Sequence, residues 1–186
     1  MKTLRHDLQR AASTIHGSKA HKIIELFKSP GVHGVISYRL WQMLQKKPFL
    51  VRLFLKPFVA IYRCHVRRWW GIDIGPEAQI GAGFMINHYG GIFIAGDVVA
   101  GEFFTVTHDI TIGYSRAKTR QGFPTIGNNV YIAPGAKLAG RIKIGNNVSI
   151  GSNAVVEKDI PDNAVVQIHP MLVVSFPINP NDIPHW

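Results

Sequence analysis

The sequence predicts a mainly β protein, a parallel β-helix that follows an N-terminal α-helical segment, on two observations. From Ile74 onward, apolar residues recur at every sixth position, a period that neither an α-helix nor an isolated strand produces. Six residues make one short strand and one corner, so three such units complete a triangular coil, and stacked coils enclose a column of aliphatic side chains. Residues 1–71 lack this period and instead have the apolar spacing of amphipathic helices.

Three stretches of the N-terminal segment have helical spacing. Residues 1–28 have the pattern of one amphipathic helix or of two short ones. Residues 32–46 and 49–70 also have this spacing, and the second of them must accommodate Pro57 as a kink or as a new start. The glycine at position 71 breaks a helix, so we place the end of an N-terminal helical domain there.

The six-residue ladder extends over residues 72–169 but is interrupted twice. We call the apolar residues at every sixth position its rungs. They are Ile74, Ile80, Ile86, Ile92, then Ile94, Ala100, Val106, Ile112, and finally Ile126, Ile132, Leu138, Ile144, Ile150 and Val156. The first change of phase implies two extra residues within 88–91, and residues 114–124 carry no rung, so we expect them to form a protruding loop. A coil of about eighteen residues predicts about four to five coils. Residues 170–186 have four prolines and no period, and an extended tail is expected.

The net charge of +10 is concentrated in the N-terminal segment. Residues 1–72 contain 14 of the 21 Lys and Arg residues, but only Asp7 and Glu25 of the 11 acidic ones. This is typical of a solvated helical face, and it also suits peripheral association with an anionic membrane, because the cations alternate with Leu, Phe, Val and Trp. No nucleic-acid-binding motif accompanies the charge, so nucleic acid is not expected as a partner.

The expected location is the cytoplasm, with the inner face of the membrane as an alternative position. The single cysteine, Cys64, excludes an intramolecular disulfide, which fits a reducing compartment. No signal pattern is visible at the N-terminus. The most apolar stretch, residues 49–62, is too short and too charged to span a bilayer.

Two histidines of the ladder, His88 and His108, each stand two residues after a rung. Their separation of twenty residues is one coil plus the two-residue insertion, so the rings should occupy the same edge on neighbouring coils, about 5 Å apart. Asp73 precedes His88 by fifteen residues, close to one coil, and is expected beneath it. A carboxylate there would fix the imidazole tautomer and make the ring a better general base. Each histidine alone would also fit a corner residue that is hydrogen-bonded to the backbone.

Residues from about Gly31 to His169 resemble the hexapeptide-repeat acetyltransferases, and specifically the serine acetyltransferase branch. The likeness rests on the segments GVHGVISYRL, GIDIGPEAQIGAG, INHYGGIFI, TVTHDITIG and IGSNAVVEKDIPDNAVV. The resemblance implies a left-handed parallel β-helix that assembles as a homotrimer or as a dimer of trimers. It also implies transfer of acetyl from acetyl-CoA to a hydroxyl group, with the acyl donor bound between adjacent subunits.

The resemblance further implies a role for each matching residue. His88 is the general base that removes the acceptor's proton, and Asp73 orients it; we add His108 as a third catalytic candidate because it shares the edge. The acyl donor is bound along the edge of the β-helix at Gly113, Tyr114, Ala133, Pro134, Gly151 and Ser152. Acetyl-CoA is the implied co-substrate, and no metal is required.

The chain departs from the serine branch at the residues expected to bind the acceptor. That branch has Asp before the catalytic histidine and Arg-His-Pro at the end of the loop, where this chain has Asn87 and the residues Gly122, Phe123 and Pro124. A zwitterionic amino acid needs fixed partners for both charges. We therefore expect a saccharide acceptor, as in the acetyltransferases of colanic-acid and capsule clusters, with Phe123 or Tyr114 against a sugar ring. The basic residues of the loop, Arg116 among them, would then contact either the phosphates of CoA or an anionic acceptor.

Other interpretations remain open from the sequence. Serine O-acetylation for cysteine synthesis is the alternative within the same chemistry. A zinc hydratase of the γ-type carbonic anhydrase kind needs three convergent histidines, and the ladder offers two, His88 and His108. A membrane-associated assembly module is the alternative that is not an enzyme.

Overall fold

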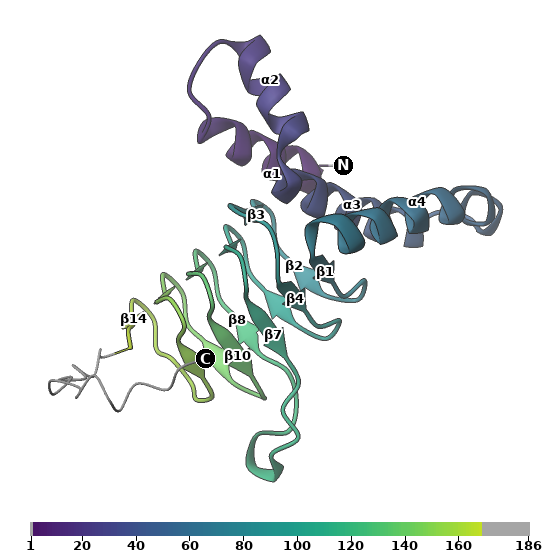
Figure 1. Cartoon of the computed structure of the whole chain (residues 1–186). Coiled ribbons are helices and arrows are strands. Elements are labelled where there is room, and N and C mark those ends of the chain that lie inside the picture. Colours follow the sequence, from purple (N-terminus) through teal and green to yellow (C-terminus); the bar gives the residue numbers. More distant parts are fainter. Residues whose placement is uncertain (1, 169–186) are drawn as a thin grey trace, which may run out of the picture.

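The computed structural model describes residues 2–168, in which four helices precede a parallel β-helix (Figure 1). The helices are α1 (Lys2–Ser13), α2 (Lys19–Lys28), α3 (Pro30–Gln45) and α4 (Phe49–Trp70). The first stretch therefore forms two helices, which was one of the two alternatives. Ser29 caps α3 through its side chain, Pro30 stands in the first turn, and α4 continues through Pro57. The predicted extended tail, residues 170–186, lies outside the described residues.

The described part of the β-helix contains fourteen short strands in three parallel sheets. In chain order they are β1 (Ile72–Ile74), β2 (Gln79–Ile80), β3 (Met85–Ile86), β4 (Ile92–Ile94), β5 (Val99–Ala100), β6 (Thr105–Val106), β7 (Thr111–Gly113), β8 (Thr125–Ile126), β9 (Tyr131–Ile132), β10 (Lys137–Ala139), β11 (Lys143–Ile144), β12 (Ser149–Ile150), β13 (Val155–Val156) and β14 (Val165–Val166). The sheets have the orders β1-β4-β7-β10-β13, β11-β8-β5-β2 and β14-β12-β9-β6-β3. From β1 to β10 each strand pairs with the third strand after it, so three strands make one coil, and about five coils are present.

The first coil contains the two extra residues predicted from the change of phase. Its strands pair with partners twenty residues later, as Ile72 does with Ile92, while β4 and β7 pair with an offset of eighteen. The insertion falls in the turn between β3 and β4, where Gly90 and Gly91 have φ values of 97° and 65°. Glycine adopts this backbone region without strain, so the local sequence permits the wider turn that carries His88.

The second predicted interruption, residues 114–124, leaves the column as a loop (Figure 1). An isolated antiparallel bridge between Ser115 and Gly122 closes the base of the loop, and a 3-10 turn, Lys118–Arg120, forms its tip. Because the chain returns to β8 in register with β5, the coils above and below the loop remain stacked.

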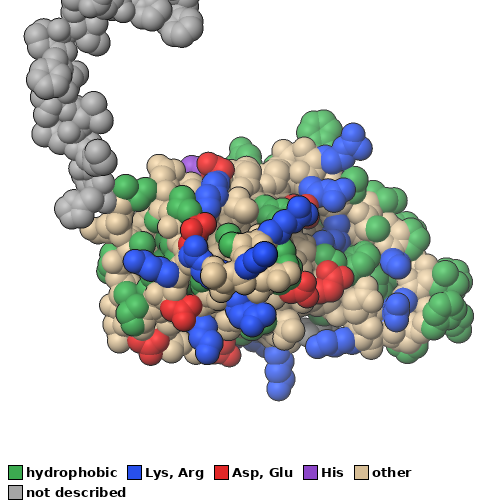
Figure 2. All heavy atoms as spheres, turned by 90° about the horizontal axis from the view of Figure 1, so that it is seen from below, with side chains coloured by type: hydrophobic (Ala, Val, Ile, Leu, Met, Phe, Trp, Pro, Cys, Tyr) green, Lys and Arg blue, Asp and Glu red, His purple; other side chains and the backbone are tan. Residues whose placement is uncertain are grey.

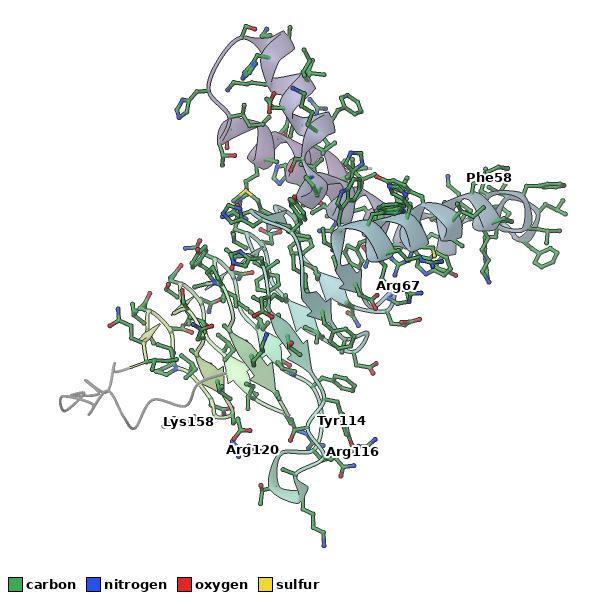
Figure 3. All side chains as sticks on the ribbon, viewed as in Figure 1. Phe58, Arg67, Tyr114, Arg116, Arg120 and Lys158 are labelled. Atoms are coloured by element: carbon green, nitrogen blue, oxygen red, sulfur yellow. The ribbon has the colours of Figure 1, made fainter. Side chains whose placement is uncertain are left out.

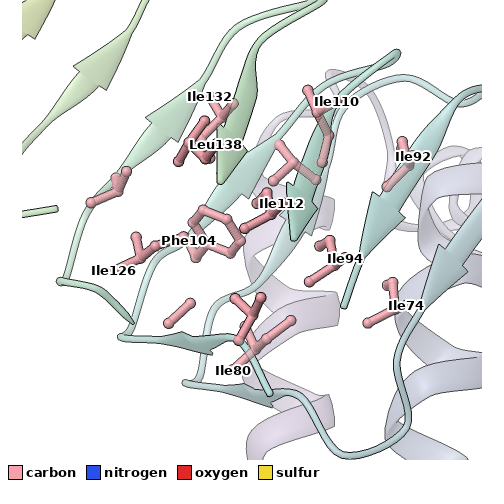
Figure 4. Close-up of a cluster of buried hydrophobic side chains, with 14 of the residues drawn as sticks. Ile74, Ile80, Ile92, Ile94, Phe104, Ile110, Ile112, Ile126, Ile132 and Leu138 are labelled. Atoms are coloured by element: carbon pink, nitrogen blue, oxygen red, sulfur yellow. The ribbon is translucent and has the colours of Figure 1, made fainter. Parts of the chain in front are cut away.

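The interior of the β-helix is a column of apolar side chains (Figure 4). The rungs that the period predicts are buried, and Ile94 and Ile112 are completely inaccessible to solvent. The ring of Phe104, also fully buried, stacks on that of Phe84 with centroids 5.7 Å apart. Since such an interior is packed as densely as a crystal, the rungs hold each turn of the coil, and its exposed corner residues, in a fixed position.

A buried ion pair joins the helices to the first coil. Asp7 on α1 and Arg39 on α3 are 1% and 3% exposed, and Asp7 Oδ2 accepts a hydrogen bond from Arg39 Nε at 2.8 Å. Arg39 also donates to the carbonyls of Ile80 (2.7 Å) and Gly81 (2.5 Å). Asp7 Oδ1 accepts from the backbone N–H of Phe84 at 2.9 Å. The helical segment therefore covers the first coil through polar groups that the sequence analysis did not single out.

The junction between α4 and β1 depends on Gly71, whose φ is 60°. A Cβ at this position would lie 3.1 Å from the backbone nitrogen of Gly91. We expect Gly71→Ala to lower the free energy of unfolding by about 1–2 kcal/mol, the cost of the left-handed conformation for an L-residue, as measured by urea unfolding. Gly113→Ala is the control, since its Cβ would meet only Phe93, at 3.8 Å. An equal loss of stability in both variants would contradict the assignment of strain to Gly71.

Candidate active site

His88 and His108 lie on neighbouring coils at one edge of the β-helix. His88 follows β3 and His108 follows β6, and these two strands pair with Ile86 opposite Val106. The ring centroids are 5.6 Å apart and the ring planes meet at 81°. Both side chains are exposed. The prediction that the two rings share an edge on successive coils is therefore confirmed.

The same edge continues over the next two coils. Because β6, β9 and β12 stack in register, Pro134 and Ser152 occupy on their coils the position that His108 has on its own. The N–H of Asn153 donates to the carbonyl of Pro134 at 2.8 Å, which ties the two turns together. Four of the residues predicted to bind the acyl donor thus lie in line with the histidines: Ala133, Pro134, Gly151 and Ser152.

A carboxylate and an ammonium group flank the histidines, and the sequence analysis missed both. Asp109, directly after His108, accepts a hydrogen bond from Lys137 Nζ at 2.8 Å. That hydrogen bond and the charge of Lys137 lower the pKa of Asp109, and the charge of His108 lowers it further. The carboxylate is therefore ionised beside the histidine edge at neutral pH. The sequence could have indicated this ion pair, because the register of the coils places Lys137 opposite Thr111, two residues after Asp109.

The predicted contact between Asp73 and His88 is not formed. Asp73 lies on β1, whereas His88 follows β3 of a different sheet. The carboxylate pairs with Arg67 on α4, with Nη1 and Oδ2 4.0 Å apart, and within residues 2–168 no hydrogen bond or ion pair joins it to His88. The reason is the length of the first coil, since a separation of fifteen residues falls short of the twenty that one turn takes here. Asp73 instead borders a cavity of about 190 Å³ together with Arg63 and Cys64.

The remaining predicted residues lie in or beside the loop, away from the histidine edge. β7 begins near that edge and ends at the loop, so Gly113 and Tyr114 stand at its far end. The ring of Tyr114 packs against Phe123 with centroids 5.1 Å apart, and Gln121 Nε2 donates to the Tyr114 hydroxyl at 2.6 Å. Arg116 is exposed at the base of the loop (Figure 3). Within one protomer these side chains therefore do not reach the histidines.

Asn87 is the predicted acceptor-binding residue that adjoins His88 in the chain. Its side chain is exposed and borders a cavity of about 280 Å³ whose walls include Ile15, Leu26 and Val32. An apolar groove of about 850 Å³ lies elsewhere, between α1, α3 and α4. Among the side chains of residues 2–168, no three His, Cys, Asp or Glu gather in a group that could hold a metal ion.

Known proteins share both the sequence and the arrangement of coils. Residues 123–158 match the family described as bacterial transferase hexapeptide (six repeats). Over 133 residues the chain is 37% identical to a serine acetyltransferase of Helicobacter pylori, which covers 71% of this chain and 74% of that protein. Over 141 residues it is 38% identical to a serine acetyltransferase of Mycobacterium tuberculosis, which covers 76% of this chain and 59% of that protein.

Solved structures of such proteins superpose on most of the chain. The serine acetyltransferase of Brucella abortus strain S19 has a TM-score of 0.73 at 26% identity, over 91% of this chain and 66% of that one. For the serine acetyltransferase of Neisseria gonorrhoeae the TM-score is 0.70 at 26% identity, over 91% of this chain and 62% of that one. The chain thus spans less than two thirds of these longer proteins. The shared fold confirms the expected left-handed parallel β-helix. The chain therefore belongs to the hexapeptide-repeat acyltransferase superfamily, as an acetyltransferase of the serine acetyltransferase-like branch.

Proposed function

We propose that the chain transfers acetyl from acetyl-CoA to an alcohol, with His88 as the general base. The observation that carries the proposal is the exposed pair of His88 and His108, on an edge that continues along stacked turns. Imidazole is the side chain that most often removes a hydroxyl proton in catalysis. As His88 takes that proton, the acceptor oxygen attacks the thioester carbonyl. The new C–O bond forms, the C–S bond breaks, and CoA leaves as a thiolate that takes up the proton.

The charges on this edge support that role. Proton uptake turns His88 into an imidazolium, which nearby negative charge favours. Asp109, held in its ionised form by Lys137, supplies negative charge on the neighbouring coil. Within residues 2–168 no hydrogen bond or ion pair joins Asp73 to His88, so the proposal does not depend on that carboxylate. His108, whose ring lies edge-on to His88, restricts the orientation of that ring.

The edge also has the chemistry that acetyl-CoA requires. From His88 to Ser152 it spans three coil spacings, about 14 Å, which suits an extended pantetheine arm. The turns along this edge carry small residues that are at least partly exposed, such as Pro134, Gly151 and Ser152, and these leave room for an extended chain. The serine acetyltransferase of Brucella abortus strain S19 has been crystallised in complex with coenzyme A. When bound, acetyl-CoA supplies the activated acyl group, and the cations of the loop are suited to its phosphates.

In this proposal, a second copy of the chain contributes its loop to the histidine edge and so completes the active site. Arg116 and Phe123 belong to the loop that follows β7, at the end of that strand away from His108, so in this proposal they serve the site of a neighbouring protomer. A loop that protrudes from one β-helix can instead reach the histidine edge of a neighbour. This supports the homotrimer, or dimer of trimers, that the family resemblance implies, with the acyl donor between adjacent subunits.

Serine is the acceptor that the comparisons support better. The relatives at 37% and 38% identity are both named serine acetyltransferase. The saccharide acceptor, our main expectation from the sequence, receives no specific support from them. We therefore take the hydroxyl of L-serine as the first acceptor to test.

A saccharide hydroxyl stays as the second candidate because of the residues at the site. Asn87 is neutral where the serine branch carries a carboxylate, and Gly122 and Phe123 replace its Arg and His. Phe123 and Tyr114 form an aromatic pair on the loop, which is a surface that suits a sugar ring better than a zwitterion.

Release of free thiol from acetyl-CoA, measured with L-serine and with a panel of glycans, separates the two candidates. We expect kcat/KM for L-serine to exceed that for each glycan at least about tenfold, the discrimination that one well-placed polar contact provides. Phe123→Ala is the paired variant, since it should lower turnover of a glycan and leave turnover of L-serine nearly unchanged. Preference for a glycan, lost in Phe123→Ala, would overturn serine as the acceptor. Failure of every acceptor to stimulate thiol release would overturn the acetyl transfer itself.

A further inference from the structure

Helix α4 carries an apolar stripe that no other described part of the chain covers. Leu50, Phe54, Phe58 and Ile61 recur at intervals of four and three and so share one face of the helix. They are 66%, 70%, 71% and 69% exposed. Phe58 lies where α4 projects away from the β-helix (Figure 3). A contiguous apolar surface of this kind marks an interaction site in a soluble protein.

Cations precede and follow the stripe along the chain, and acidic side chains are missing from this part of the sequence. Lys46 and Lys47 precede α4 and Arg68 lies near its end, and all three are exposed. Between Glu25 and Asp73 the sequence has no Asp or Glu. Figure 2 shows hydrophobic and basic side chains together at the right-hand end of the molecule. The surface is therefore both apolar and strongly positive.

We infer that this stripe docks on the surface of a bilayer that contains anionic lipid. The apolar face enters the boundary between headgroups and acyl chains, and the flanking Lys46, Lys47 and Arg68 contact the anionic headgroups. Such binding places α4 along the surface, with the β-helix held outside the bilayer. In residues 2–168 no helix has both the length and the apolar character needed to cross a membrane.

A second copy of the chain suits this surface less well. A contact between two α4 helices would bring Lys and Arg side chains of both copies together. The acidic residues available to offset them in the helical segment are Asp7 and Glu25. Asp7 is buried against Arg39, and Glu25 pairs with Lys28 at 3.0 Å. Charge complementarity therefore favours a negatively charged surface over a homotypic contact.

Sedimentation of the full chain with lipid vesicles tests the inference. We expect binding to vesicles of phosphatidylcholine and phosphatidylserine in equal parts, and much weaker binding to phosphatidylcholine alone. The double variant Phe54→Gln, Phe58→Gln should lower the partition coefficient on the mixed vesicles at least about tenfold, because two aromatic side chains no longer leave water. The double variant Lys46→Gln, Lys47→Gln should lower the partition coefficient about tenfold or more on mixed vesicles, and should leave it unchanged on vesicles of phosphatidylcholine alone.

The matched control is Val165→Gln, which removes an apolar side chain of similar exposure, 65%, from β14. It should bind vesicles like the unmodified chain. Absence of binding to mixed vesicles, or an equal loss in the control, would overturn the inference. So would a lower molecular mass in solution for the Phe54, Phe58 variant, because the stripe would then be covered by another copy. An unchanged mass together with weaker vesicle binding supports the membrane assignment.

Discussion

Replacement of His88 with alanine is expected to lower kcat for acetyl transfer by about 10²- to 10⁴-fold, the usual contribution of a general base. The imidazole acts on the proton that leaves as the acceptor attacks, so the loss should fall on kcat and leave KM for acetyl-CoA nearly unchanged. The structure supports this expectation because His88 is exposed on an edge shared with His108. Initial rates of thiol release at saturating acetyl-CoA measure the effect.

Two further variants make this result specific. His16→Ala removes an exposed histidine between α1 and α2 and should leave the rate unchanged. Asp73→Asn should cost much less than His88→Ala, because Asp73 pairs with Arg67 rather than with the imidazole. Full activity of the His88 variant would refute its role as base. A loss in Asp73→Asn as large as that in His88→Ala would show that the carboxylate reaches the ring during catalysis.

Replacement of Asp7 with alanine is expected to lower the free energy of unfolding by about 3–5 kcal/mol. The change leaves the guanidinium of Arg39 buried without its counter-charge, and the N–H of Phe84 without its acceptor. A buried charge that loses its partner keeps its full desolvation cost, which is why this loss exceeds the value of an ordinary hydrogen bond. Urea unfolding followed by circular dichroism provides the measurement.

Glu25→Ala is the matched control for that experiment. It removes the carboxylate of an exposed ion pair with Lys28, and such pairs contribute about 0–1 kcal/mol. The double replacement of Asp7 and Arg39 by Leu and Met should recover part of the lost stability, since no charge is then left in the interior. Similar stability of the Asp7 and Glu25 variants would contradict the placement of Asp7 in the core.

The architecture could be predicted from the sequence because the six-residue period is a direct consequence of packing. Every rung that points inward must be apolar, so Ile94, Ile112 and their equivalents recur wherever the chain completes a side of the triangle. The same logic located the insertion near Gly90 and the loop at 114–124, because each interrupts the count. It also placed His88 beside His108, since both positions are counted from rungs of the same sheet.

The contacts that depend on distant or irregular parts of the chain could not be predicted in this way. Asp7 and Arg39 are polar residues of amphipathic helices, and helical spacing alone assigns such residues to the solvent face. Asp73 was expected beneath His88 because fifteen residues were treated as close to one coil, whereas one coil takes twenty residues here and pairs Asp73 with Phe93. The pairing of Asp109 with Lys137 crosses the loop, so it becomes visible only when the coils are stacked in register.

The cover that the helices place over the first coil has a consequence for solubility. Outward backbone carbonyls of that coil, at Ala78, Ile80 and Gly81, accept hydrogen bonds from Tyr38 and Arg39. A solenoid whose terminal rim is bare offers a template for strands from other chains and tends to polymerise into fibrils. Because the helical segment occupies those acceptors, we expect it to act as a cap that prevents end-to-end association of β-helices at the first coil.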